Sequence, residues 1–180
     1  MRLVAFLRAL NVGGHNTVTM DYLRTVFDAE GFANVETFIA SGNVIFDGDE
    51  EDIAGLERVI EQMLLDALGY EVTTFIRTDA EVRNIAKHKP FMAATLKTAT
   101  ALNVALFKES LDAKAARTVM ALKTSTDEFH VRGKEIYWLS RRKQSDSRIS
   151  NAVFEVSLGR PSTMRGINTI RNLATKYGPR

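Results

Sequence analysis

The sequence has no cysteine among its 180 residues, which excludes disulfide bonds, thiolate metal ligands and a cysteine nucleophile. No apolar run approaches the roughly 20 residues that a membrane-spanning helix requires, so we expect no membrane partner. The apolar run at residues 3–7 ends at Arg8 and is shorter than the roughly 7–15 residues of a signal-peptide core. These absences predict a soluble cytoplasmic protein.

Several common catalytic and cofactor-binding signatures are also missing. The chain contains no GxxxxGK[ST], GxGxxG, HExxH or GxSxG pattern. Its three histidines, His15, His88 and His130, are isolated from one another in the sequence, and no helical pair has the spacing of metal ligands. We therefore predict no cofactor and no metal, and the sequence assigns no reaction class.

The overall composition is that of a globular protein, with 45% hydrophobic and 26% charged residues, but its charge is unevenly placed. Residues 131–180 hold eleven Lys and Arg against three Asp and Glu, a net charge of +8, whereas residues 1–130 carry −6. A basic end suits a nucleic acid, a phosphorylated small molecule or an acidic partner. The alternatives are an ordinary solvated surface, or a basic half that complements the acidic residues 47–52 within the molecule.

The first 78 residues show the pattern strand–helix–strand–strand–helix–strand. Thr19 suits a helix N-cap, Gly31 and Gly69 suit helix ends, and Ser41-Gly42-Asn43 suits a tight hairpin. The second helix has an apolar face at Ile53, Leu56, Ile60, Leu64 and Leu68. Strands are predicted at residues 3–10, 35–40, 44–46 and 72–76. This order is the ferredoxin-like split arrangement.

The rest of the chain repeats much of that order after a connector at residues 79–98, where Thr78 and Glu81 form a capping box for a short helix. Strands are predicted at 101–107, 128–131 and 136–139, and helices at 112–122, at 149–158 and from Ile167 onward. We therefore predict an α+β fold of two ferredoxin-like βαββαβ-type subdomains, at 1–78 and 99–180, with extra C-terminal helices in the second.

Three polar segments are candidate site elements. In the first, Arg8, Asn11, Gly13 and Gly14 lie where a strand ends and a helix begins, a place where backbone N–H groups bind anions. The other segments are Ser41-Gly42-Asn43 and the group Thr163, Arg165, Asn168 and Thr169 at the start of the last helix. The simpler interpretations are a turn for the first two, and capping of the last helix by Asn168 or Thr169 for the third.

Taken together and in this order, the segments RALNVGG, FIASGNVIF, IRT, KPF and TMRGINT resemble a bacterial family of unknown function, the domain-of-unknown-function family numbered 1697. The resemblance runs over nearly the whole chain. It implies a two-part α+β fold of ferredoxin-like subdomains and no established activity.

The family patterns R-G-I-N-V-G-G, Q-S-G-N-V and T-x-R-N-W-N-T imply a shared set of ligand-binding positions. In this sequence they fall on Arg8, Asn11, Gly13, Gly14, Ser41, Gly42, Asn43, Thr163, Arg165, Asn168 and Thr169. The sequence departs from the patterns at Ala9, His15, Thr17, Gly166 and Ile167, among others. The loss of two lysines after Gly14 weakens a phosphate-binding role for that loop, and the loss of Trp at position 167 removes a stacking surface.

Three functions stay open from the sequence. The first is a module that binds a nucleic acid or a phosphorylated anionic ligand, acting as a monomer or weak dimer. The second is a small enzyme without a cofactor, whose polar pocket combines Arg8, Asn11, Ser41, Asn43, Arg165 and Asn168. The third is a protein-interaction or structural role in which these polar groups satisfy backbone atoms.

Overall fold

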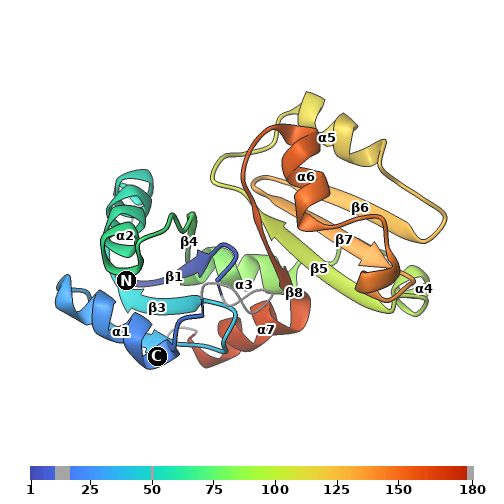
Figure 1. Cartoon of the computed structure of the whole chain (residues 1–180). Helices are drawn as coiled ribbons and strands as arrows, with labels where there is room; N and C mark the ends of the chain where they lie inside the picture. The colour runs from blue at the N-terminus through green and yellow to red at the C-terminus, as the bar shows by residue number, and fades with distance from the viewer. Residues whose placement is uncertain (11–16, 50, 178–180) are drawn as a thin grey trace. The chain divides into compact units, whose positions relative to one another are not determined.

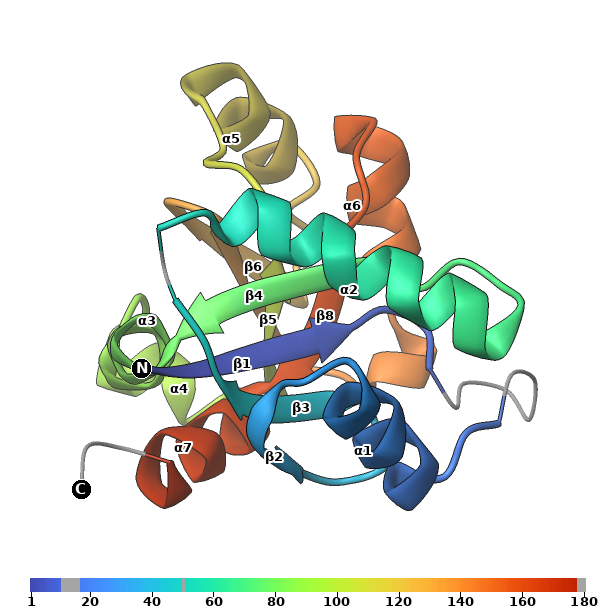
Figure 2. The same cartoon turned by 90° about the vertical axis from the view of Figure 1, so that its left-hand side faces the viewer.

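The first unit of the chain is built around a four-stranded antiparallel sheet. The computed structural model describes residues 1–10, 17–49 and 51–177. The elements of the first half follow in the order β1 (Arg2–Leu7), α1 (Met20–Ala29), β2 (Ala33–Thr37), β3 (Asn43–Asp47), α2 (Ile53–Leu68) and β4 (Thr74–Thr78). The strands pair in the order β2-β3-β1-β4, and both helices cover one face (Figure 2).

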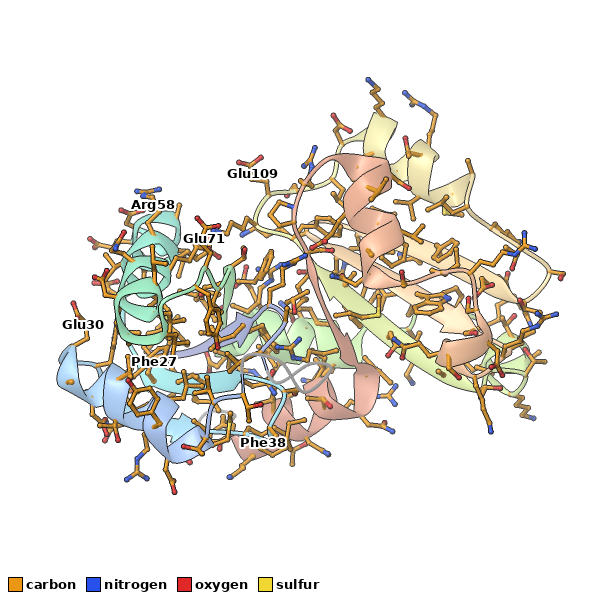
Figure 3. The ribbon with its side chains drawn as sticks, in the orientation of Figure 1. Phe27, Glu30, Phe38, Arg58, Glu71 and Glu109 are labelled. Carbon is orange, nitrogen blue, oxygen red and sulfur yellow. The ribbon has the colours of Figure 1, made fainter. Side chains whose placement is uncertain are left out.

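Alternation along β1 supplies the core of this unit. Leu3, Ala5 and Leu7 point to the helix-covered face, where they join Leu23 and Phe27 of α1 and Ile60 and Leu64 of α2. Phe27 lies beneath its helix, whereas Glu30, Arg58 and Glu71 project outward (Figure 3). Val4 and Phe6, on the other face, are also buried, which explains why β1 is apolar throughout rather than alternating.

Two further helices follow the first sheet. Helix α3 (Asp79–Lys87) begins with the predicted capping box, because Thr78 N donates to Glu81 Oε2 at 2.8 Å and Glu81 N donates to Thr78 Oγ1 at 3.1 Å. The short helix α4 (Ala93–Leu96) was not predicted from the sequence. The chain divides into two compact units, one from Met1 to Ile85 with the residues from Asn172 onward, the other Ala86–Arg171. The predicted domain limits 1–78, 79–98 and 99–180 stay a prediction.

The second unit repeats the topology of the first. Its elements are β5 (Ala101–Leu106), α5 (Ala113–Met120), β6 (Asp127–Arg132), β7 (Glu135–Ser140), the 3-10 helix Gln144–Asp146, α6 (Asn151–Leu158) and β8 (Thr163–Gly166). The strand order β6-β7-β5-β8 matches β2-β3-β1-β4 position for position, and α5 and α6 cover one face (Figure 1). The predicted α+β fold of two βαββαβ-type subdomains is therefore confirmed.

The last strand corrects the sequence analysis at one place. Residues Thr163–Gly166, which were expected at the start of the last helix, pair with β5 as an antiparallel strand. Helix α7 (Ile167–Lys176) starts directly after this strand, so Asn168 and Thr169 lie inside its first turn. The predicted capping by either residue is wrong, because the position before the helix is Gly166.

Candidate functional site

The end of β1 and the loop before β3 lie together in the first unit. Leu7 N donates to Gly42 O at 2.8 Å, and Arg8 N donates to Thr73 O at 2.9 Å. Gly42 has φ +78°, and a Cβ there would lie 3.2 Å from the Cβ atoms of Leu7 and Leu10. Glycine is therefore required at this crossing by both backbone conformation and space. The candidate residues Asn11, Gly13 and Gly14 lie outside the described residues.

Asn43 holds the loop between β2 and β3. Its fully buried side chain donates from Nδ2 to Phe38 O at 2.8 Å and to Ser41 Oγ at 3.1 Å, while Phe38 N donates to Asn43 O at 2.9 Å. These bonds satisfy loop backbone that would otherwise be buried without partners. The expected tight hairpin at Ser41-Gly42-Asn43 is instead a five-residue connection, 38–42, which Asn43 closes.

The remaining candidates lie in the second unit, on β8 and the start of α7. Arg165 is buried, and its Nη1 donates to Thr163 Oγ1 at 2.8 Å and to Met164 O at 2.9 Å. Burial lowers the pKa of the Arg165 guanidinium to about 10. Asn168 is exposed and Thr169 half-buried. The structure thus brings Arg8 close to Ser41–Asn43 in one unit, and Thr163 close to Arg165 in the other.

Asp127 organises one end of the second sheet and was not singled out from the sequence. Its buried carboxylate accepts hydrogen bonds from Thr124 Oγ1 at 2.7 Å, Trp138 Nε1 at 2.8 Å, Ser147 Oγ at 3.0 Å and Thr126 Oγ1 at 3.1 Å. Burial alone would raise the pKa of Asp127, but these four donors outweigh it and the pKa is lowered. The sequence feature that could have indicated this network is the cluster of hydroxyl-bearing residues just before the strand that begins with Asp127.

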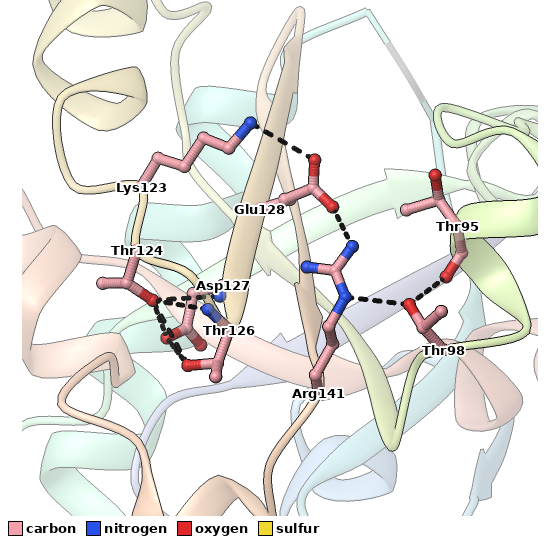
Figure 4. A network of polar contacts seen from close by, with 8 residues as sticks. All are labelled: Thr95, Thr98, Lys123, Thr124, Thr126, Asp127, Glu128 and Arg141. Atoms are coloured by element: carbon pink, nitrogen blue, oxygen red, sulfur yellow. Dashed lines mark hydrogen bonds and ion pairs between the residues drawn. The ribbon is translucent and has the colours of Figure 1, made fainter.

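A second network fixes Arg141 at the same end of the sheet (Figure 4). Arg141 Nη2 donates to Glu128 Oε2, Lys123 pairs with the other Glu128 oxygen at 3.4 Å, and Arg141 Nε donates to Thr98 Oγ1 at 2.8 Å. The hydrogen bond from Arg141 is the main reason that the pKa of Glu128 is lowered. The first cation of the Arg141-Arg142-Lys143 run is therefore already neutralised within the protein.

The cations that follow Arg141 are not neutralised in this way. Residues 140–150, which we call the basic loop, continue with Arg142, Lys143 and Arg148, all exposed and without an ion pair among the described residues. Ser140 Oγ donates to Arg142 O at 3.0 Å, and Ser147 is bound to Asp127, so both ends of the loop are anchored. Its three free positive charges face solvent from a fixed backbone.

Two histidines that are distant in sequence meet on the other face of the same sheet. The ring of His88 lies 5.1 Å from that of His130 and 5.0 Å from that of Tyr137. His88 Nε2 is buried without a hydrogen-bond partner within the described part of the chain. Desolvation first, and then the positive charge of Arg132, lowers the pKa of both imidazoles. Both rings are therefore neutral at pH 7.

Two other kinds of feature are absent from the described residues. No group of three or more His, Asp or Glu side chains among them is placed to hold a metal ion. Within the same residues, no helix is long and apolar enough to cross a membrane.

Comparison with known proteins places the chain in a family. No curated protein matches it. The conserved bacterial protein SP0830 from Streptococcus pneumoniae has a similar solved structure, with a TM-score of 0.72 and 23% sequence identity over 97% of each chain, which shows a common fold. A family model described as a protein of unknown function (DUF1697) matches residues 1–137. With about three quarters of its length matched, the chain belongs to this family of unknown function.

Proposed function

We propose that this protein binds a nucleic acid through the basic second unit, in the cytoplasm and as a monomer or weak dimer. The proposal rests on one observation, which is that one of the two units has a net positive charge and the other a net negative charge. Residues 86–171 hold sixteen Lys and Arg against seven Asp and Glu, a net charge of +9, whereas the remaining residues hold eight against fifteen, a net charge of −7. A basic domain of this kind supplies the phosphate attraction that dominates nucleic-acid affinity.

The basic loop concentrates that attraction. Arg142, Lys143 and Arg148 are exposed and unpaired within the described chain, while Arg141, Asp127 and Ser147 hold the loop in place. Lys97, also exposed, precedes Thr98, the residue that Arg141 Nε contacts. A rigid backbone lowers the entropy lost when cations engage phosphates, so this loop favours binding beyond what net charge alone gives.

The chain's low aromatic content argues for backbone contacts over base stacking. Aromatic residues make up 8% of the sequence, and the only tryptophan, Trp138, is fully buried and donates to Asp127. Tyr137 is buried as well. We therefore expect little sequence preference and a strong dependence on salt.

Fluorescence anisotropy with a labelled 20-nucleotide single strand tests the proposal. For three phosphate contacts we expect the affinity to fall roughly 20-fold between 50 and 200 mM salt, with a log–log slope near −2. The variant R142Q/K143Q removes two free cations and should make that slope shallower by about 1.4. Its matched control is K114Q/R117Q, which removes two exposed cations from α5 in the same unit.

Either of two results overturns the proposal. One is the absence of binding at 50 mM salt. The other is an identical loss of slope in both variants, which would show that the overall charge acts rather than the basic loop.

A further inference from the structure

We infer that the outer edge of β6 is a dimerisation site, where β6 of one molecule pairs antiparallel with β6 of a second copy. β6 is the last strand in the order β6-β7-β5-β8, so only one of its sides is bonded to a neighbouring strand (Figure 1). The pairing joins two four-stranded sheets across a two-fold axis. The inference goes beyond the proposed function, because nucleic-acid binding uses the basic loop and does not require this edge.

Backbone hydrogen bonds at the two ends of β6 show which of its residues face away from β7. Arg141 N donates to Thr126 O at 2.8 Å, so the even-numbered residues of β6 bond to β7. Leu111 N, from outside the sheet, donates to Gly133 O at 2.8 Å on the side of the odd-numbered residues. Because backbone groups alternate between the two sides of a strand, the odd-numbered residues direct their N–H and C=O groups away from β7.

Two odd-numbered residues of β6 have free backbone groups. Asp127 is bonded at both of its groups, since its N donates to Thr124 Oγ1 at 3.0 Å and its O accepts from Thr124 N at 3.1 Å. Within the described chain, no group bonds to the outward N–H and C=O of Phe129 or Val131. The free edge therefore consists of the N–H and C=O groups of these two residues, bounded by Asp127 at one end and Gly133 at the other.

The other sheet edges are protected against such pairing. The outward N–H groups of β4 donate to glutamate carboxylates at 2.8–2.9 Å, Thr74 to Glu61, Ile76 to Glu57 and Thr78 to Glu81. β2 is interrupted by a bulge between Ala33 and Glu36. β8 has only four residues, and Glu155 accepts from Ser162 N just before it. β6 has six residues in unbroken register and none of these protections.

One antiparallel register uses all of the free groups. When the two strands pair with His130 at the centre, Phe129 exchanges two hydrogen bonds with Val131 of the second copy, and Val131 does the same with Phe129 of that copy. Centring the pair on Phe129 instead would set Val131 opposite Asp127, and centring it on Val131 would set Phe129 opposite Gly133. Both Asp127 and Gly133 have their carbonyl oxygens already bonded, so the register centred on His130 is favoured.

The same register sets opposite charges against each other. Glu128 lies opposite Arg132 of the second copy on both sides of the axis, and directly opposed side chains of opposite charge stabilise a sheet. Arg132 is exposed and has no ion pair among the described residues. Glu128 keeps Arg141 and Lys123 (Figure 4), because a carboxylate has about four acceptor sites. His130 faces its own copy, and the two imidazoles do not repel each other because burial lowers their pKa and keeps them neutral at pH 7.

The contact is small, and the units that meet in it are both basic. One strand of a few residues from each copy buries less than the roughly 1,200–2,000 Å² of a stable interface. Residues 86–171 carry a net charge of +9, so two copies also repel each other until salt screens the repulsion. We therefore expect a weak dimer that is favoured by salt and populated at millimolar rather than micromolar protein.

Single-cysteine cross-linking tests the register directly, because the chain has no cysteine of its own. In His130→Cys, the two substituted positions are directly opposed with Cα atoms about 4.5 Å apart, within the range of about 4.4–6.8 Å that a disulfide spans. The matched control is Arg132→Cys, on the same face of β6 and more exposed. Position 132 lies four residues, or about 13 Å along the strand, from the same position of the second copy.

With diamide as the oxidant at 0.3 M salt, we expect His130→Cys to form the covalent dimer at least about tenfold faster than Arg132→Cys, because association raises the effective concentration of the opposed thiols. Equal rates, or faster cross-linking of Arg132→Cys, would overturn the inference, since random collisions favour the more exposed position. Far-UV circular dichroism checks that both variants keep the fold.

A charge reversal tests the pairing of Glu128 with Arg132. The variant H130C/R132E sets two carboxylates opposite each other and should cross-link several-fold more slowly than H130C/K134E, which makes the same change of net charge in the adjacent turn. Equal rates in these two variants would contradict the register.

The unmodified chain supplies a test without any substitution. In two-dimensional ¹⁵N NMR at 0.3 M salt, the backbone amide signals of Phe129 and Val131 should shift between 0.1 and 2 mM protein. Those of Thr74 and Ile76, whose N–H groups are bonded to glutamates, should not. No shift at Phe129 and Val131 up to 2 mM would overturn the inference and leave this edge to a strand of a different protein.

Discussion

Asp127 is the residue whose removal we expect to affect the second unit most. In Asp127→Asn, the new amide N–H₂ must face hydroxyl and indole groups that now donate to the carboxylate. We expect a loss of about 1–3 kcal/mol in the free energy of unfolding. Urea denaturation followed by the fluorescence of Trp138, the only tryptophan and a partner of Asp127, measures it directly.

The same substitution at Asp66 is the control, because Asp66 is exposed on α2 and contacts only Gln62 among the described residues. It should change the free energy of unfolding by no more than about 0.5 kcal/mol. Equal effects of Asp127→Asn and Asp66→Asn on the free energy of unfolding would show that the buried carboxylate stabilises the fold no more than an exposed one does.

The His88–His130 pair makes stability depend on pH. Burial and Arg132 hold both imidazole pKa values below the ordinary 6.5, so the unfolded chain binds protons more readily than the folded one. The stabilisation is complete above the unfolded pKa, and it is lost progressively as the pH falls below about 6.5. The free energy of unfolding should therefore fall between pH 7.5 and 5.

The double variant H88Q/H130Q should flatten that dependence, since glutamine does not titrate. Glu128, Arg132 and Tyr137 lie on the same face of the sheet. The hydrogen bond from Arg141 lowers the pKa of Glu128 and burial raises the pKa of Tyr137, so neither of these two groups accounts for a change between pH 7.5 and 5. A slope in the double variant as steep as in the unmodified chain would assign the pH dependence to other groups.

Residue roles were harder to predict than residue positions. Sequence spacing placed Ser41, Gly42 and Asn43 at a turn, and the structure shows Asn43 and Gly42 serving its backbone. The importance of Asp127 could not be predicted, because it depends on Trp138 across the sheet and on Ser147, 20 positions away in the sequence, and no local pattern encodes those contacts.

At the scale of the single element, Gly69 ends α2 in the left-handed conformation. Its φ is +79°, its N–H donates to Leu65 O at 2.8 Å, and nothing lies within 4 Å of an added Cβ. Gly69→Ala should therefore cost about 1 kcal/mol from backbone strain alone. Thermal unfolding followed by far-UV circular dichroism measures the change.

Gly166→Ala is the comparison for that prediction, because φ at Gly166 is not positive and an added Cβ meets only an ordinary contact. It should change stability by less than about 0.5 kcal/mol. If both exchanges cost the same, the backbone conformation at Gly69 is not what makes glycine necessary there.

Element prediction succeeded where the apolar period was long and failed where it was short. The apolar face from Ile53 to Leu68 and the expected end at Gly69 predicted α2, since sixteen residues give several turns of regular spacing. Strand β8 was missed because four residues, Thr163–Gly166, include one arginine and one glycine and show no apolar alternation. Its pairing with β5 supplies the stabilisation that its own sequence lacks.

At the scale of the whole molecule, the repeated topology was predictable but its charge division was only partly so. The strand–helix–strand–strand–helix–strand pattern predicted two similar subdomains, and the two sheets do share one strand order. The sequence alone assigned a net charge of +8 to residues 131–180. The contrast is larger between units, +9 against −7, because residues 86–130, with seven Lys and Arg against four Asp and Glu, belong to the second unit.

That contrast predicts self-association controlled by salt. A molecule with oppositely charged parts attracts other copies when the Debye length is long, about 30 Å at 0.01 M ionic strength. The attraction is much weaker at 0.15 M, where the Debye length is about 8 Å. Sedimentation equilibrium should give an apparent mass above 20.1 kDa that rises with protein concentration at 0.01 M, and 20.1 kDa at 0.3 M. An apolar interface would behave in the opposite way, since salt does not screen it. A mass that stays above 20.1 kDa at 0.3 M would therefore assign the association to an apolar surface. A mass of 20.1 kDa in both buffers would contradict the prediction, because the attraction between the basic unit of one molecule and the acidic unit of another would then be too weak to form an interface.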